Sequence, residues 1–330
     1  MKSFKALVVR ENEDGTFSSA IENKNIEDLP EGDVLIKVKY SSLNYKDALS
    51  SIGNRGVTKK YPHTPGIDAA GVVVESSDDN FTKGEEVIVT SYDLGMNTDG
   101  GFGEYIRVPS DWVVTLMPGL TLKDSMIYGT AGFTAAMSVN ALIEGGITPE
   151  MGDVLVSGAS GGVGSLAVSI LKKLGFTIAG VSGKKDEIEY LTSLGVSKVL
   201  SIEEATDTSG RPMLKPRWAA CIDTVGGEIL ETSIKSTKPN GVVTSCGNAA
   251  GPNLNLTVFP FILRGIKLVG IDSQNYPMAK RKKVWLKLGT EWKVESIDKV
   301  VNEVILEDIT PKIEDMLAGR HKGRTIISYQ

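Results

Sequence analysis

Glycines 158, 161, 162 and 164 are the residues whose spacing most directly indicates chemistry. They follow a short apolar run and precede apolar residues at the spacing of one helix face. Glycine has no Cβ, so a phosphate can approach the main chain, and the N-terminus of a helix attracts it. We therefore predict that a dinucleotide diphosphate binds here, at Ser160, Gly161, Gly162 and Val163.

The run reads G-x-x-G-G-x-G rather than the usual dinucleotide-binding pattern G-x-G-x-x-G. The prediction of a dinucleotide site therefore depends on the strand expected before the run and the helix expected after it. The alternative is a glycine turn that only packs a helix on a strand and binds nothing. The next strand ends near Val181, about where an NAD-binding unit carries an acid for the ribose. This window has no acid but has Ser182, Gly183, Lys184 and Lys185.

A hydroxyl and two ammonium groups could donate charge-assisted hydrogen bonds to a 2′-phosphate. We therefore predict NADPH as the cofactor, held in part by Ser182, Gly183 and Lys184. The alternative is a solvated charge pair before a helix that has Asp186 in its first turn.

The composition is that of a globular protein with a large core: 330 residues, 41% hydrophobic and 23% charged. A net charge of −5 gives no reason to expect nucleic acid or an anionic membrane as partner. We find no signal-peptide core and no apolar run approaching a membrane span. The chain has two cysteines, which fits a reducing compartment, and we expect a cytoplasmic location. With two histidines and no C-x-x-C motif, we expect no metal site.

The elements that position these residues fall into two groups. Short predicted strands separated by Gly and Pro, up to about residue 123, indicate an irregular β domain. Strands and helices then alternate, which indicates a doubly wound parallel sheet, after a helix at 123–145 broken by Gly129 and Gly132. The last forty residues are expected to return to the first domain. The predicted domains are therefore 1–123 with 291–330, and 124–290.

Several stretches resemble the medium-chain dehydrogenase/reductase superfamily: P-G-I-D-A-A-G at 65–71, G-F-G-E-Y at 101–105, G-T-A-G-F-T-A at 129–135 and the glycine run. The stretches S-S-L-N-Y-K-D-A-L at 41–49, I-D-T-V-G at 222–226 and P-F-I-L-R at 260–264 resemble its zinc-free quinone oxidoreductase side, most closely the acrylyl-CoA reductase (YhdH/YhfP-type) branch. The likeness covers essentially the whole chain.

This resemblance implies an α/β fold: a GroES-like irregular β domain, a doubly wound Rossmann domain and a cleft between them. It also implies a homodimer through an edge strand at 266–271. Further cofactor-binding residues implied by the family are Tyr45, Thr130, Lys198, Asn248, Ile262, Ser273 and Arg324. Gly323 and Arg324 could equally form a turn with an exposed charge.

The zinc ligands of metal-dependent members are missing, because Leu43 or Asn44 stands where they have Cys, and Ile67 and Asp68 stand about where they have His. Such a site suits hydride addition to an already polarised double bond better than alkoxide formation. We expect catalysis from Tyr45, whose phenol can donate a proton or hydrogen bond, with Asn44 as an orienting amide. Tyr45 could instead be a core or lid aromatic, and Asp47 and Asp68 are expected to be turn or cap residues.

The basic run 279–283 could meet the phosphates of a CoA thioester or form a solvated helix face. His63 and His321 are expected at the surface. The favoured function is an NADPH-dependent reductase of an activated C=C, with acrylyl-CoA as its substrate. The alternatives are an NADPH:quinone oxidoreductase and an NADPH-binding protein without significant turnover.

Overall fold

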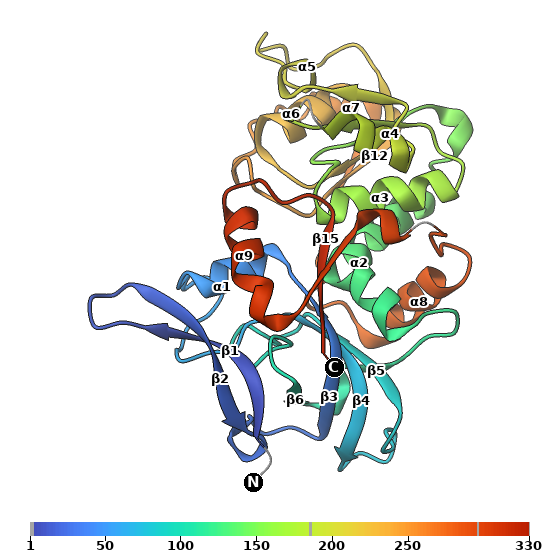
Figure 1. The fold of residues 1–330 in the computed structure, drawn as a ribbon. Helices are drawn as coiled ribbons and strands as arrows, with labels where there is room; N and C mark the ends of the chain where they lie inside the picture. Colours follow the sequence, from blue (N-terminus) through green and yellow to red (C-terminus); the bar gives the residue numbers. More distant parts are fainter. Residues whose placement is uncertain (1–2, 185–186, 296, 330) are drawn as a thin grey trace. The chain divides into compact units, whose positions relative to one another are not determined.

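The computed structural model describes residues 3–184, 187–295 and 297–329. The chain divides into two compact units (Figure 1). The first comprises Met1–Thr130, Gln274–Thr290 and Val300–Gln330, and the second comprises Ala131–Ser273 and Glu291–Lys299. Residues from Val300 onward cluster with the first unit and Glu291–Lys299 with the second, whereas the sequence predicts a return from residue 291, and the predicted domain bounds stay a prediction.

The first unit is built on a mixed sheet with the strand order β14-β15-β3-β4-β5-β7, to which β6 adds by pairing with β3. A separate antiparallel hairpin pairs β1 with β2. The bounds are β1 Ser3–Glu11, β2 Phe17–Asn25, β3 Val34–Ser42, β4 Asp68–Ser76, β5 Glu86–Thr90, β6 Tyr105–Val108, β7 Val113–Thr115, β14 Val301–Val304 and β15 Arg324–Ser328.

Helices α1 (Tyr45–Ser51) and α9 (Ile309–Leu317) pack on each other in this unit (Figure 1). Their core contains Leu43, Ala48 and Phe102 against Ile309 and Ile313. Since these residues are apolar and fully or almost fully buried, they hold the start of α1 in place.

Helix α8 (Met278–Gly289) clusters with the first unit, whereas the sequence analysis assigned it to the second. Its buried Arg281 explains the difference, because a buried guanidinium requires acceptors. It donates to the Thr90 carbonyl at 3.2 Å and hydroxyl at 3.0 Å, and it lies 4.5 Å from the centre of the Tyr92 ring. The basic run 279–283 is therefore split: Arg281 is buried, while Lys280, Lys282 and Lys283 are exposed.

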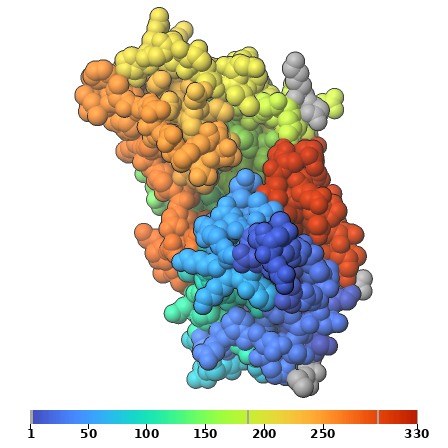
Figure 2. Space-filling model, turned by 90° about the vertical axis from the view of Figure 1, so that its left-hand side faces the viewer, coloured from blue at the N-terminus to red at the C-terminus, as the bar shows by residue number. Residues whose placement is uncertain are grey.

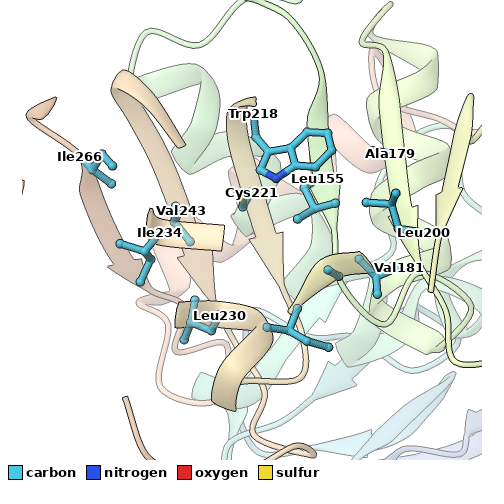
Figure 3. Close-up of a cluster of buried hydrophobic side chains, with 12 residues drawn as sticks. Leu155, Ala179, Val181, Leu200, Trp218, Cys221, Leu230, Ile234, Val243 and Ile266 are labelled. Carbon is cyan, nitrogen blue, oxygen red and sulfur yellow. The ribbon is translucent and has the colours of Figure 1, made fainter. Parts of the chain in front are cut away.

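The second unit is a parallel sheet with the order β10-β9-β8-β11-β12-β13, so it is the predicted doubly wound Rossmann domain. The bounds are β8 Val154–Val156, α3 Gly162–Lys173, β9 Ile178–Val181, α4 Ile188–Leu194, β10 Lys198–Leu200, α5 Ile202–Ala205, β11 Trp218–Asp223, α6 Gly227–Lys235, β12 Thr237–Ser245, α7 Phe259–Arg264 and β13 Lys267–Gly270. Figure 3 shows apolar side chains of the sheet and α6 gathered in one cluster, among them Leu155, Trp218 and Leu230.

Helix α2 (Leu122–Glu144) begins in the first unit and ends in the second. It bends at Gly129 (φ 51°, ψ −157°), as the sequence analysis expected, but it continues as a helix through Gly132. By length and composition it could cross a membrane, although no such run was expected. Its apolar window is 78% buried in the structure, as in the core helix of a globular protein.

Candidate functional site

The turn between β8 and α3 uses its glycines for two different purposes. Gly158 has φ 57°, and a Cβ on Gly164 would lie 2.2 Å from the Gly158 carbonyl oxygen. These two glycines are therefore needed for the turn itself. A Cβ on Gly161 would meet nothing closer than 3.4 Å, so the fold does not need a glycine there.

Gly161 is the N-cap residue of α3, and residues 160–163 are partly exposed. The first N–H groups of a helix have no intrahelical acceptor. This turn also lies at the carboxyl end of β8, where β8 has β9 on one side and β11 on the other, which is where such sheets bind ligands. The residues thus fit the diphosphate of a dinucleotide, as the sequence predicts.

Beyond the end of β9, three predicted cofactor-binding residues converge on one carboxylate. The Ser182 hydroxyl donates to Glu187 Oε2 at 2.6 Å, and the Lys184 ammonium donates to Glu187 Oε1 at 3.2 Å. The Lys184 N–H also donates to the Ser182 hydroxyl at 3.2 Å. Burial works to raise the pKa of Glu187, but hydrogen bonds from Ser160, Ser182 and Lys184 outweigh it and lower the pKa.

Glu187 was not predicted from the sequence, because it lies two residues beyond the stretch 180–185 in which a ribose-binding acid was expected. Lys185 and Asp186 lie outside the described residues. A signal for it was present in the sequence: dinucleotide-binding domains carry an acid roughly 20 residues past the glycines, and Glu187 lies about that far past Gly164, the last glycine of the run. Glu187 comes just before α4 and is only 2% exposed.

The remaining predicted cofactor residues of the second unit are more scattered. Asn248 lines an open depression of about 610 Å³ with other residues at and just after the carboxyl ends of β12 and β13. The Ser273 hydroxyl accepts a hydrogen bond from Thr134 at 2.9 Å. Ile262 is 68% exposed on α7. Lys198 is exposed at the amino end of β10, whereas Ser182 follows the carboxyl end of β9, so the structure does not bring these two together.

In the first unit, Asp68 is the centre of a buried polar cluster. Its Oδ2 accepts from the Ser42 hydroxyl at 2.6 Å, from the Asn44 amide at 2.8 Å and from the Thr130 N–H at 2.8 Å. Its Oδ1 accepts from the Thr130 hydroxyl at 2.6 Å. Asp68 is the first residue of β4 and is fully buried, so the expectation of a turn or cap residue is wrong.

Arg324 supplies the positive charge of this Asp68 cluster. Its guanidinium donates to the Ser42 hydroxyl at 2.7 Å, to the Asn44 side-chain oxygen at 3.2 Å and to the Ile127 carbonyl at 3.0 Å, and it lies 3.8 Å from Asp68 Oδ2. It is 1% exposed, so it is no exposed charge on a turn. All these partners belong to the first unit, and its predicted contact with the cofactor stays a prediction.

Gly129 makes the cluster possible. A Cβ there would lie 2.4 Å from Asp68 Oδ2 and 2.6 Å from the Ser42 hydroxyl. The bend that this glycine permits at positive φ turns the Thr130 N–H toward Asp68. The helix bend expected from sequence therefore positions a polar site.

Asn44 and Tyr45 stand at the start of α1 beside this cluster. The Asn44 amide donates to Asp68 and to the Ser42 carbonyl, and its oxygen accepts from Arg324, so its orientation is fixed. Asp47 closes a capping box with Asn44, as expected of a cap residue, and accepts from the Ile67 N–H at 2.8 Å. Burial, together with the charge of Asp68, raises the pKa of Asp47 to about 7. Tyr45, in contrast, is 52% exposed.

The two histidines differ from the expectation that both lie at the surface. His63 is buried, and its Nε2 lies 2.8 Å from the Gly95 carbonyl oxygen, while His321 is partly exposed. Among residues 3–184, 187–295 and 297–329, no group of three or more His, Cys, Asp or Glu is placed to hold a metal ion.

Comparison with known proteins shows which protein family the chain belongs to. The model described as the alcohol dehydrogenase GroES-like domain matches residues 30–118, and the zinc-binding dehydrogenase model matches residues 162–288. YhfP of Bacillus subtilis, which bears the name of a quinone oxidoreductase, is 43% identical over 98% of both chains. The acrylyl-CoA reductase AcuI of Ruegeria pomeroyi is 40% identical, also over 98% of both chains.

Solved structures agree with these relatives. The yhdH oxidoreductase of Salmonella enterica, in complex with NADP, has a TM-score of 0.96 at 41% identity and covers 99% of this chain and 100% of its own. The structure of Bacillus subtilis yhfP has NAD bound, with a TM-score of 0.96 and all of both chains covered. This chain therefore belongs to the medium-chain dehydrogenase/reductase superfamily, in the branch of YhdH, YhfP and the acrylyl-CoA reductases.

Proposed function

We propose that this chain is an NADPH-dependent reductase that adds hydride to the activated C=C of an α,β-unsaturated carbonyl, with acrylyl-CoA as its substrate. The observation that carries the cofactor is that Ser182 and Lys184 lie together beyond β9 as a hydroxyl and an ammonium donor, which both now donate to Glu187. The AcuI name of a relative 40% identical over 98% of this chain supports the substrate.

The chain would bind the cofactor through main chain and side chains in separate places. The N–H groups at the start of α3 bind the diphosphate, and Ser182 and Lys184 bind the 2′-phosphate. NADPH, when bound there, would supply the hydride. The hydride and a proton together saturate the double bond.

Tyr45 is the proposed catalytic residue. As hydride reaches the β-carbon, negative charge develops on the carbonyl oxygen, and a phenol can donate a hydrogen bond to it. Tyr45 is 52% exposed, unlike the buried Asn44 and Asp47 beside it, and this exposure supports contact with a ligand. Asn44 has its amide fixed by Asp68 and Arg324, and it is therefore proposed to position the start of α1.

Rates of NADPH oxidation at 340 nm with acryloyl-CoA, crotonyl-CoA and 1,4-benzoquinone test the proposal. We expect the highest kcat/KM of the three for acryloyl-CoA. Tyr45→Phe is expected to lower kcat on acryloyl-CoA by about 10²-fold, the lower range for general acid catalysis. Full kcat in this variant would exclude the proton-donor role.

A quinone oxidoreductase is the second candidate, favoured by the name of YhfP at 43% identity. Faster turnover of benzoquinone than of either CoA thioester would select it. Binding of NADPH without consumption of any of the three acceptors would instead select a cofactor-binding protein.

We also propose a cytoplasmic homodimer. The edge strand β13 exposes Leu268 (37%), and nearby in sequence Val258, Ile262 and Leu263 are each more than 60% exposed. The segment that carries them, orange in Figure 2, lies at the surface. An exposed apolar group beside an unpaired strand edge suits pairing with a second copy. A monomer mass in light scattering at micromolar concentration would contradict the dimer.

A further inference from the structure

A buried carboxylate already occupies the donors that the cofactor's 2′-phosphate requires. We propose that Glu187 is a specificity-determining residue: it competes with the 2′-phosphate for Ser182 and Lys184, weakens the preference for NADPH, and offers an acceptor to the ribose of NADH. This inference rests on the proposed function, because it concerns the dinucleotide-binding site of that function.

The contacts show how closely Glu187 takes the place of a phosphate. Its two oxygens receive the Ser182 hydroxyl at 2.6 Å and the Lys184 ammonium at 3.2 Å. The Lys184 N–H is directed to the Ser182 hydroxyl at 3.2 Å, which fixes that hydroxyl as a donor to the carboxylate. Two anions cannot both accept the single Ser182 hydrogen.

Charge makes the competition stronger. The Glu187 side chain is 3% exposed, whereas that of Lys184 is 36% exposed. The lowered pKa of Glu187 keeps the carboxylate ionised near neutral pH. A 2′-phosphate would bring about two further negative charges to a site whose lysine is already paired with a carboxylate. NADPH must therefore separate Glu187 from its donors, and part of the 2′-phosphate's binding energy is lost in doing so.

The ribose of NADH carries a hydroxyl at the same place. A hydroxyl donates to a carboxylate, which is how an acid at this position serves NAD in other doubly wound domains. The same Glu187 would thus help one cofactor and hinder the other. The chain is then expected to bind both dinucleotides, with a modest rather than a large difference between them.

The test is the affinity of the full-length protein for NADPH, NADH, 2′,5′-ADP and 5′-AMP, measured by titration calorimetry without a second substrate. Glu187→Gln keeps the shape of the side chain and removes its charge. It is expected to bind NADPH and 2′,5′-ADP about tenfold more tightly than the parent, and to bind NADH more weakly. The matched control is Glu189→Gln, two residues along the chain and exposed, which should leave all four affinities within about twofold.

Glu187→Ser is a second variant that also removes the carboxylate, and it tests the inference if Glu187→Gln does not fold. Circular dichroism checks that both variants are folded. An unchanged ratio of NADPH to NADH affinity in a folded Glu187 variant would overturn this inference alone. If the parent protein bound neither NADPH nor NADH, both the proposed function and this inference would be wrong.

Discussion

Two carboxylates, Asp68 in the first unit and Glu187 in the second, each accept a serine hydroxyl at 2.6 Å beside a cation, yet they are held very differently. Asp68 receives donors from β3, the start of α1 and the bend of α2, with the Arg324 guanidinium of β15 at 3.8 Å. Glu187 is held by Ser182 and Lys184, which lie close by in the sequence, and by Ser160.

The difference indicates what each cluster can do. Moving Asp68 would break its hydrogen bonds to β3, the start of α1 and α2 and leave the Arg324 guanidinium buried without its counter-charge, so the Asp68 cluster is expected to hold its shape. Glu187 can change partner at lower cost, because the Lys184 side chain is partly exposed and water can reach it. A rigid cluster stands beside the proposed catalytic tyrosine, and an exchangeable one stands where the cofactor would be selected.

The largest expected effect comes from removing the buried cation. Arg324→Met leaves Asp68 as an uncompensated buried charge, and we expect a loss of about 3–5 kcal/mol in the free energy of unfolding. Denaturant unfolding of this variant measures it. The control is Arg320→Met, whose exposed ion pair with Asp315 should cost less than about 1 kcal/mol. Equal losses in the two variants would show that the Asp68 cluster is not rigid.

Gly129 tests the same cluster through the backbone. Gly129→Ala places a Cβ 2.4 Å from Asp68 Oδ2 on a residue with φ 51°, and we expect a loss of about 2–3 kcal/mol from strain and broken hydrogen bonds. Gly161→Ala, whose Cβ would meet no atom closer than 3.4 Å, should leave stability within about 1 kcal/mol and weaken NADPH binding. Unfolding midpoints and NADPH titrations of both variants separate the two roles.

Asp47 adds a dependence on pH. Its pKa is raised to about 7 in the folded chain, from 3.8 when unfolded. The folded state therefore holds this proton more tightly, and the stability that this provides is present below about pH 4 and lost as the pH rises toward 7. Relative to Asp47→Asn, the parent should lose about 2 kcal/mol between pH 5 and pH 7. A pH-independent difference between their unfolding free energies would contradict the raised pKa.

The smallest expected effect on stability is that of Glu187. Because Glu187→Gln can keep a hydrogen bond from Ser182 and frees a lysine whose side chain is partly exposed to water, we expect a change of less than about 1 kcal/mol. A loss as large as that of Arg324→Met would mean that the Glu187 cluster is as rigid as the Asp68 cluster. The proposed exchange of partners would then be excluded.

The sequence by itself determined the glycine turn, because strand, turn and helix are contiguous and each follows a local rule of spacing or backbone freedom. It also determined the bend at Gly129. It missed β2, whose residues are mostly exposed and polar and give no alternating pattern. The family likeness identified the branch, but not how these side chains meet.

Only the tertiary structure decided the partners of Asp68, the burial of Arg324 and Arg281, and the contact of Glu187 with Ser160. Whether a charged side chain is buried, and what it meets there, depends on segments that are far apart in the sequence. The free energy of a charge is set by its neighbours in space, and spacing along the chain does not record them.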